Sequence, residues 1–231
     1  LILIDNGSTD GSDAIARAAG EMLNDVETIH LHEAQPGKIH ALETAMPHIT
    51  TELVAFGDAD TWYPPHYLAR AQAAFDAGGD AVSAVMAMDV PFPPDGGAAR
   101  RKLFWRSGIA SRLLPRQTHT GGFGQTFRTA ALKAAGGYSH RHWPYVLMDH
   151  EIMQRVLKAG RAVYPLDFWC IPSPRRADRS SVRWNLAERI LYHATPFAAK
   201  DWYFYRFLGP RLQKRRATHL ALREKPWEKR G

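Results

Sequence analysis

The sequence predicts an α/β fold in which a mostly parallel, Rossmann-like sheet is flanked by helices. Short apolar runs alternate with helical segments of about 10 to 15 residues, and connections of that length favour parallel pairing of the strands. The chain has 231 residues, of which 45% are hydrophobic, so it can bury a sizeable core. Strands are expected at residues 1–4, 26–32, 52–56 and 80–90.

Helices are expected between these strands, at residues 13–23, 37–49 and 64–79. The first follows the dense turn signal NGSTDGS, and its apolar residues recur on one face. The second is weakened at Pro47. The third has prolines at its start and glycines at its end, which is the asymmetry typical of a helix.

Charge is unevenly distributed along the chain. Residues 175–231 hold 15 Lys/Arg and 5 Asp/Glu, a net charge of +10, whereas residues 1–174 hold 15 and 18, a net charge of −3. This pattern predicts a near-neutral body with a function of its own, followed by a basic, aromatic-rich, largely helical extension that contacts an anionic partner, and it argues against a nucleic-acid-binding protein. The extension fits either a helix packed on the body with a solvated basic face, or peripheral contact with an anionic membrane.

The sequence has no expected bilayer span or secretory signal and a single cysteine, and these features limit the localisation and the metal ligands that we expect. No window approaches the roughly 18 apolar residues of a bilayer span, and the first residues do not resemble a secretory signal, so we expect a cytoplasmic protein that is at most peripheral at the inner face of the membrane. Cys170 is the only cysteine, which excludes an internal disulfide and a cysteine-based zinc site. A metal would need oxygen or histidine ligands.

Three aspartates follow expected strands. Asp5 follows LILI, and Asp58 and Asp60 follow ELVAF. In open α/β sheets ligands bind outside the carboxyl ends of the strands. Asp5 alone also fits turn chemistry, but Asp58 and Asp60 would repel each other unless a cation or donors compensate. Mg²⁺ or Mn²⁺ takes oxygen ligands and bridges one or two carboxylates to diphosphate oxygens, which makes the pair a candidate metal site, although Asp-x-Asp alone is a weak motif.

Five motifs in order resemble the family 2 glycosyltransferases with the GT-A fold. They are LILIDNGSTDGS, GKIHALETAM, FGDADTWYPPHYL, GGFGQTFRTAALKAAGGY and MDHEIMQRVLKAGRAVY. An ordered set is far more specific than any one motif. The resemblance implies a GT-A catalytic domain at residues 1–174, with a nucleotide-sugar half at about 1–90 and an acceptor half at about 91–174, followed by the extension at 175–231.

On the donor side, the resemblance implies that Asp5 contacts the nucleotide base, which is chemically sensible for the imide N–H of uracil. Members often have two consecutive aspartates there, whereas this chain has Asn6 second. Lys38 would screen the nucleotide or diphosphate, although it also fits a solvated position in a helix's first turn. Asp60 would coordinate Mg²⁺ or Mn²⁺, and Asp58 would contact the ribose, the sugar or the metal.

On the acceptor side, the resemblance places the catalytic base at Asp149, a position that also fits a helix N-cap. Glu151 would orient the base or touch the acceptor. Gly121 and Gly122 would allow close approach of an acceptor sugar, or simply make a turn. Met148 replaces an acid that the family usually has before the base.

Part of a further motif follows. Processive members carry Gln-x-x-Arg-Trp, and here Arg183 and Trp184 remain while Ser180 replaces the glutamine, so long-polymer synthesis is not expected. The resemblance implies that Arg183 and Trp184 bind the acceptor. Arg175 and Arg176 could serve an anionic acceptor.

The function implied is inverting, metal-dependent transfer of a sugar from a nucleotide-sugar, most often a UDP-sugar, to a carbohydrate or lipid-linked acceptor, as in cell-surface polysaccharide or glycolipid synthesis. The family normally opens with an apolar strand and a Pro-x-Tyr-Asn-like turn, so we expect the sheet and the nucleotide site to lack that strand here. One alternative is a sugar-nucleotide nucleotidyltransferase, which would need a basic glycine-rich loop that DNGSTDGS does not provide. The other is a non-catalytic nucleotide-sugar-binding or anion-binding module.

Overall fold

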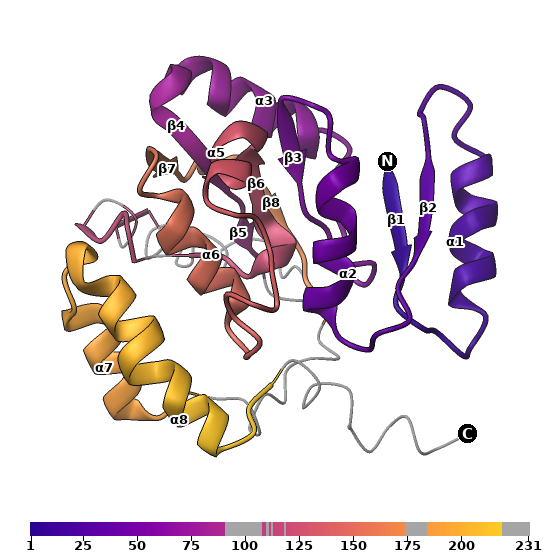
Figure 1. The fold of residues 1–231 in the computed structure, drawn as a ribbon. Helices are drawn as coiled ribbons and strands as arrows, with labels where there is room; N and C mark the ends of the chain where they lie inside the picture. Colours follow the sequence, from indigo (N-terminus) through magenta and orange to yellow (C-terminus); the bar gives the residue numbers. More distant parts are fainter. Residues whose placement is uncertain (91–107, 110, 112, 118, 174–183, 219–231) are drawn as a thin grey trace.

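The computed structural model describes residues 1–90, 108–109, 111, 113–117, 119–173 and 184–218 (Figure 1). Up to residue 90 the elements are β1 (Ile2–Asp5), α1 (Ser12–Glu21), β2 (Ile29–His32), α2 (Lys38–Ala45), β3 (Leu53–Ala55), α3 (Tyr67–Gly78), β4 (Val82–Met86) and β5 (Met88–Asp89). Beyond it they are β6 (Gln125–Arg128), α5 (Thr129–Ala134), α6 (Met148–Val156), β7 (Arg161–Val163), β8 (Trp169–Cys170), α7 (Leu186–Ala194) and α8 (Gly209–Lys214). Short 3-10 turns are η1 (Met46–His48), η2 (Gly79–Ala81), η3 (Gly122–Gly124) and η6 (Phe197–Ala199), and η7 (Trp202–Leu208) is a π-helix.

The strands and helices expected before residue 90 are all present, so the predicted α/β class is confirmed. The central sheet has the order β3-β6-β4-β7, while β1–β2 and β5–β8 form separate two-stranded parallel sheets. β4 and β7 pair in parallel, as expected. The expectation of a mostly parallel central sheet is corrected by β6, which lies between β3 and β4 and runs antiparallel to both. The central sheet is therefore mixed.

The core has two parts, one on each face of the central sheet. β4 is buried throughout, so its alternate side chains enter different clusters. Ala84 and Met86 pack with α5, α6 and the C-terminal elements, whereas Val85 packs with α3 and Phe168. Val82 departs from this alternation because the register with β7 shifts between Val82 and Ala84.

The C-terminal elements pack on α6. Figure 1 shows α7 and α8 on the opposite side of the molecule from β1, β2 and α1. Tyr203, Phe204 and Leu208 of η7 share a buried cluster with Ile152 and Met153 of α6. The described part of the extension thus joins the core through its apolar face. No helix in the described parts of the chain is both long and apolar enough to span a bilayer.

Candidate active site

Asp5, the residue expected to contact the nucleotide base, ends β1. Its side chain is only 7% exposed, it accepts the Ser8 amide hydrogen at 3.1 Å, and one carboxylate oxygen lies 2.9 Å from His32 Nδ1. Hydrogen bonds from Ser8, with His32 adding to them, hold the pKa of the Asp5 carboxyl below its usual value despite its burial. A carboxylate kept ionised in this way remains an acceptor.

Asn6 fixes the start of α2 relative to β1. Its amide nitrogen donates to the carbonyls of Glu33 and Gln35, at 3.0 and 2.7 Å, and its side-chain oxygen accepts the Gly37 amide hydrogen at 2.7 Å. Gly37 has φ 127°, a conformation that only glycine adopts without strain. Asn6, which stands where family members often have a second aspartate, therefore positions the helix that carries Lys38.

Lys38 and Asp58 form an ion pair between α2 and the turn after β3. The Asp58 side chain is 9% exposed, and its backbone amide donates to the Tyr63 hydroxyl at 3.1 Å. Tyr63 in turn donates to the Phe123 carbonyl at 2.9 Å, and burial raises its pKa to about 12, so it remains a donor. These contacts tie the Asp-x-Asp turn to the glycine segment that precedes β6. Asp60 is half-buried in the same turn.

Gly122 lies close to both Lys38 and Asp149. An added Cβ at Gly122 would lie 3.6 Å from Lys38 Nζ and 3.8 Å from Asp149 Cβ. Lys38 of α2 and Asp149 of α6 therefore border the same glycine, although they are far apart in the sequence. At Gly121 an added Cβ would instead lie only 2.6 Å from the ring of Phe123. The glycine at this position therefore leaves room for the phenylalanine ring.

Asp149 is the second residue of α6, where the helix N-terminus favours a carboxylate. The alternative role as an N-cap is not observed, because Leu147 occupies the cap position and no side chain caps the helix. Leu147 has φ 68°, a strained conformation for a leucine, and it sets the direction in which the chain enters α6. The Asp149 Oδ1 accepts the His150 amide hydrogen at 3.1 Å.

Gln125 anchors the backbone of Asp149. It is fully buried in β6, and its amide nitrogen donates to the carbonyls of Thr120 and Asp149 at 2.9 and 3.1 Å. Tyr138 completes the arrangement by donating to the Gln125 side-chain oxygen at 3.1 Å. Burial, and then the negative charges of Asp149 and Asp58, raise the pKa of Tyr138 far above its usual value. The negative charges of both carboxylates thus raise the pKa of the same buried tyrosine.

Glu151 is buried rather than exposed at the protein surface. It is 1% exposed, and its two oxygens bind Arg155 Nε and Nη2 at 2.7 and 2.8 Å. Tyr205 of η7 also donates to it. The structure therefore places Glu151 inside the protein, where it links α6 to the C-terminal elements.

Trp184 packs against α6. Its ring is 5.3 Å from the ring of His150 and 4.7 Å from that of Tyr192 in α7. His150 also contacts the ring of His119 at 5.6 Å. The structure thus packs Trp184 against the residue that follows Asp149 in α6. Arg175, Arg176, Ser180 and Arg183 lie outside the described residues.

The sequence and the fold identify the family. The model of glycosyl transferase family 2 matches residues 1–135, more than half of the chain. The chain belongs to this family. No curated protein sequence matches the chain.

Solved structures of glycosyltransferases share the fold at low identity. The mannosyltransferase PcManGT from Pyrobaculum calidifontis, in complex with GDP-Man and Mn²⁺, is 22% identical with a TM-score of 0.63, and the match covers 95% of this chain and 64% of that one. TarS from S. aureus in complex with UDP-GlcNAc is 17% identical with a TM-score of 0.55, covering 99% and 68% of the two chains.

A third structure is glucosyl-3-phosphoglycerate synthase from Mycobacterium tuberculosis with Mn²⁺, UDP-glucose and phosphoglyceric acid. It is 17% identical with a TM-score of 0.51, and the match covers 85% of this chain and 69% of that one. At these identities the likeness shows the GT-A fold. This family 2 chain spans 64% of the length of the mannosyltransferase.

Several positioning residues of this family 2 domain have no local sequence signal. Tyr63, Gln125, Tyr138 and Leu147 act through contacts or backbone angles that depend on distant parts of the chain. Only Asn6 carried a signal, since it departs from the family's second aspartate.

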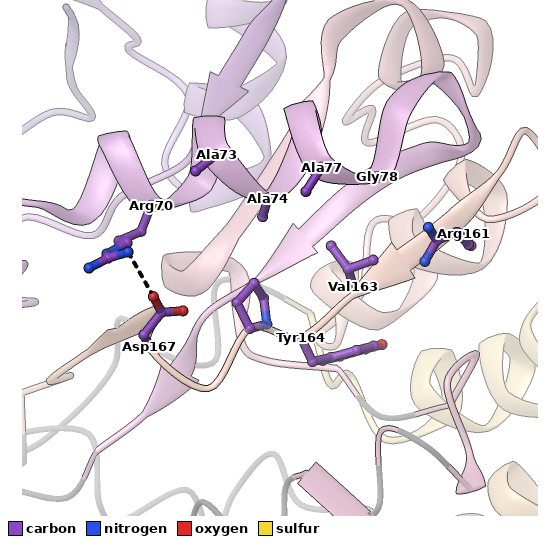
Figure 2. Close-up of a pocket in the computed structure, with 10 residues that line it drawn as sticks. Arg70, Ala73, Ala74, Ala77, Gly78, Arg161, Val163, Tyr164 and Asp167 are labelled. Atoms are coloured by element: carbon purple, nitrogen blue, oxygen red, sulfur yellow. Dashed lines mark ion pairs between the residues drawn. The ribbon is translucent and has the colours of Figure 1, made fainter.

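A separate hollow of about 470 Å³ lies between α3 and β7. Figure 2 shows the alanines of α3 on one side, Val163 and Tyr164 on the other, and the ion pair between Arg70 and Asp167 at 3.0 Å. Among the residues that the structure describes, none of the candidate donor or acceptor residues lines it. The hollow is therefore distinct from the candidate active site.

Proposed function

We propose that this chain transfers a sugar from a nucleotide-sugar to an acceptor hydroxyl, with inversion at the anomeric carbon and with a divalent cation. The observation that supports this best is the position of Gly122, whose Cβ would contact both the lysine of the donor half and the proposed base. A reacting sugar needs cationic charge on its diphosphate side and a base on its acceptor side, within a few ångströms of each other.

On the donor side, Asp5 would accept from the nucleotide base, which favours UDP-sugars. Its carboxylate is ionised, and its present partner His32 is an exposed side chain that can turn aside. Lys38 would leave Asp58 and bind a diphosphate oxygen, since its ammonium already lies at the junction of the two halves. The mannosyltransferase PcManGT binds GDP-Man and TarS binds UDP-GlcNAc, so nucleotide-sugars occur in both structural relatives.

Asp60, with Asp58 beside it, would hold Mg²⁺ or Mn²⁺. The turn offers two carboxylates and, within the described residues, the single cluster of three metal-binding side chains lies elsewhere. Such a set suits a cation held by one or two carboxylates and completed by diphosphate oxygens. When bound, the cation supplies positive charge that offsets the charge of the leaving diphosphate.

On the acceptor side, Asp149 would remove the proton from the acceptor hydroxyl as its oxygen attacks the anomeric carbon. The bond from that carbon to the diphosphate oxygen breaks, and the nucleoside diphosphate leaves. Trp184, which packs against His150 of the same helix, would offer an aromatic face for an acceptor sugar. Glu151 would position α6 through Arg155 and Tyr205 rather than touch the acceptor.

Contact with an anionic membrane would bring the domain to a lipid-linked acceptor. Exposed apolar and basic side chains occur together on α7, where Leu186 is 72% and Ile190 59% exposed and Arg189 lies between them. Such a mixture is typical of interfacial helices. Co-sedimentation with vesicles of mixed anionic and neutral lipids, compared with neutral vesicles alone, would test this contact.

The donor proposal is tested by thermal shift with Mn²⁺ and a panel of UDP-, GDP- and dTDP-sugars. We expect one donor class to raise the Tm, the rise to disappear in Asp60→Ala, and the control Asp25→Ala, an exposed loop aspartate, to behave as wild type. No rise with any donor at millimolar concentration would overturn the proposal, and a rise that survives Asp60→Ala would remove Asp60 from the metal site. Release of diphosphate from a nucleoside triphosphate, in place of nucleoside diphosphate from the donor, would identify a nucleotidyltransferase instead.

A further inference from the structure

Two histidines and a glutamate meet where α2 contacts the turn after α5. His40 and Glu43 lie on α2, and His140 belongs to a segment about 100 residues further along the chain. One potential ligand atom from each residue lies within 4.8 Å of the other two. His140 Nδ1 is 2.5 Å from Glu43 Oε2, and the rings of His40 and His140 are 5.0 Å apart.

The backbone around Glu43 holds its carboxylate in place. Ser139 Oγ donates to one oxygen and the His140 amide to the other, both at 3.1 Å. The orientation of the carboxylate is therefore fixed by hydrogen bonds, as an outer hydrogen-bonding shell does for metal ligands.

The cluster is separate from the proposed active site. His40 is two residues after Lys38, which places it about 200° around the helix from the lysine. Lys38 points to Asp58 and Gly122, whereas His40 faces His140. The side chains of His140 and Glu43 are 42% and 33% exposed, so a solvated ion can reach them.

The three side chains also match a known type of metal site. Two imidazoles and one carboxylate are a ligand set that zinc accepts, with a fourth position left for water. Nitrogen ligands also favour the later first-row metals over Mg²⁺ and Mn²⁺.

We propose that His40, Glu43 and His140 bind a divalent transition-metal ion of the Zn²⁺ type. For bonds of about 2.0–2.1 Å in tetrahedral geometry, the ligand atoms would lie roughly 3.3 Å apart. The His140 and Glu43 atoms would separate by less than about 1 Å to reach this spacing, which a partly exposed imidazole can do by rotation. The ion would cross-link α2 to the turn that leads toward α6.

The test is calorimetric titration of Zn²⁺ into the chelator-treated full chain carrying Asp60→Ala, without nucleotide. The Asp60→Ala background removes the proposed donor cation from the measurement, so this test does not depend on sugar transfer. We expect one ion per chain at micromolar affinity or better. His40→Ala and His140→Ala, added singly, are expected to weaken binding by about 10- to 100-fold or more, whereas His48→Ala, an exposed histidine just beyond α2, leaves it unchanged.

Two further measurements guard against misfolding. Glu43→Gln keeps the shape of the side chain and its acceptor oxygen, so it reports on the ligand role even where a histidine variant folds poorly. Co²⁺ in place of Zn²⁺ gives an intense visible absorption in a four-coordinate site, and we expect this band to be lost in the ligand variants. Zn²⁺ binding that is equal in His40→Ala, His140→Ala and the parent, or that is weaker than about 1 mM in the parent, would overturn the proposal.

Discussion

Asp58 lies in a half-exposed turn, whereas Asp149 begins a helix whose following turns are buried. On the donor side, the carboxylates of Asp5 and Asp58 are balanced by His32 and Lys38, whose side chains are 58% and 36% exposed. Near Asp149, the proposed base, the buried side chain of Gln125 donates to the Asp149 carbonyl, and Tyr138 donates to Gln125. The backbone of Asp149 is therefore positioned by residues of the core.

The difference suggests how the two halves would work. Exposed partners such as Lys38 and His32 can leave when a nucleotide and a cation arrive, at little cost in stability. A catalytic base must instead be held in one geometry before the acceptor arrives, which a buried network does. The donor half would thus be completed by its ligands, while the acceptor half is formed in advance.

The largest expected effect is on catalysis. Asp149→Asn keeps the shape of the side chain and an oxygen for the His150 amide, but it removes the base, so we expect turnover to fall by about 10²- to 10⁴-fold. The dissociation constant of the donor should stay within about twofold. Nucleoside diphosphate release measures the turnover, and calorimetry measures donor binding. Asp60→Ala should instead act mainly by weakening donor binding. If the two variants change turnover and donor affinity in the same way, the division into two halves is contradicted.

The next effect is on stability. Arg155→Met leaves Glu151 buried without its partner, so we expect the free energy of unfolding to fall by about 3–5 kcal/mol. Lys38→Met leaves behind Asp58, which is 9% exposed compared with 1% for Glu151 and so is nearer to water, and we expect a smaller loss of about 1–3 kcal/mol. Urea unfolding of both variants gives the comparison, provided the m-values agree. Equal losses would show that the donor side is held as firmly as the base side.

Adding Glu151→Gln to Arg155→Met provides the control. The double variant removes the uncompensated charge, so it should regain part of the lost stability. A double variant as unstable as Arg155→Met alone would mean that Arg155 acts mainly through its bonds to the backbone at Ala135 and Gly137.

Much of the donor half could be predicted from the sequence, because its features are local. The runs LILI and ELVAF became β1 and β3, and their aspartates stand at or just after the strand ends. Lys38 begins α2 where Gly37 indicated a helix start. Apolar runs, glycines and strand-end acids are signals carried by a few consecutive residues.

The acceptor half depends on contacts between distant residues, which no local pattern reveals. β6 was not predicted as a strand, because its antiparallel pairing with β3 joins residues more than 70 positions apart. Glu151 was expected to orient the base or touch the acceptor, and its motif gave no sign of the contact with Tyr205, 54 residues later. The φ of Leu147 is likewise imposed by its surroundings, since leucine does not favour it.

A smaller effect separates two neighbouring glycines. At Gly124 an added Cβ would lie 2.6 Å from Thr120 Cγ2 and 3.3 Å from Ala87 Cβ, so we expect Gly124→Ala to cost about 1–3 kcal/mol of stability. Gly122→Ala meets only ordinary contacts and should change stability by less than about 0.5 kcal/mol. It would, however, occupy space between Lys38 and Asp149, and we expect weaker substrate binding. Unfolding and donor titrations on both variants test this, and a Gly122→Ala protein with unchanged donor affinity and turnover would remove that space from the site.

The smallest expected effect concerns Lys200, which extends the buried contacts of the base side. Its ammonium lies 3.6 Å from the ring centre of Tyr192, which also contacts His150, and burial lowers the pKa of Lys200 to about 8. Because this pKa is below that of the unfolded chain, the unfolded state binds more protons above about pH 8, and the contribution of Lys200 to stability rises with pH there, by at most about 1.4 kcal/mol per pH unit. Lys200→Met should remove this rise between about pH 8 and 9.5, while Lys214→Met, an exposed lysine of α8, should keep it. Urea unfolding across that range measures how the free energy of unfolding changes with pH. Identical slopes in the two variants would mean that Lys200 is hydrated and does not belong to the buried contacts around Tyr192.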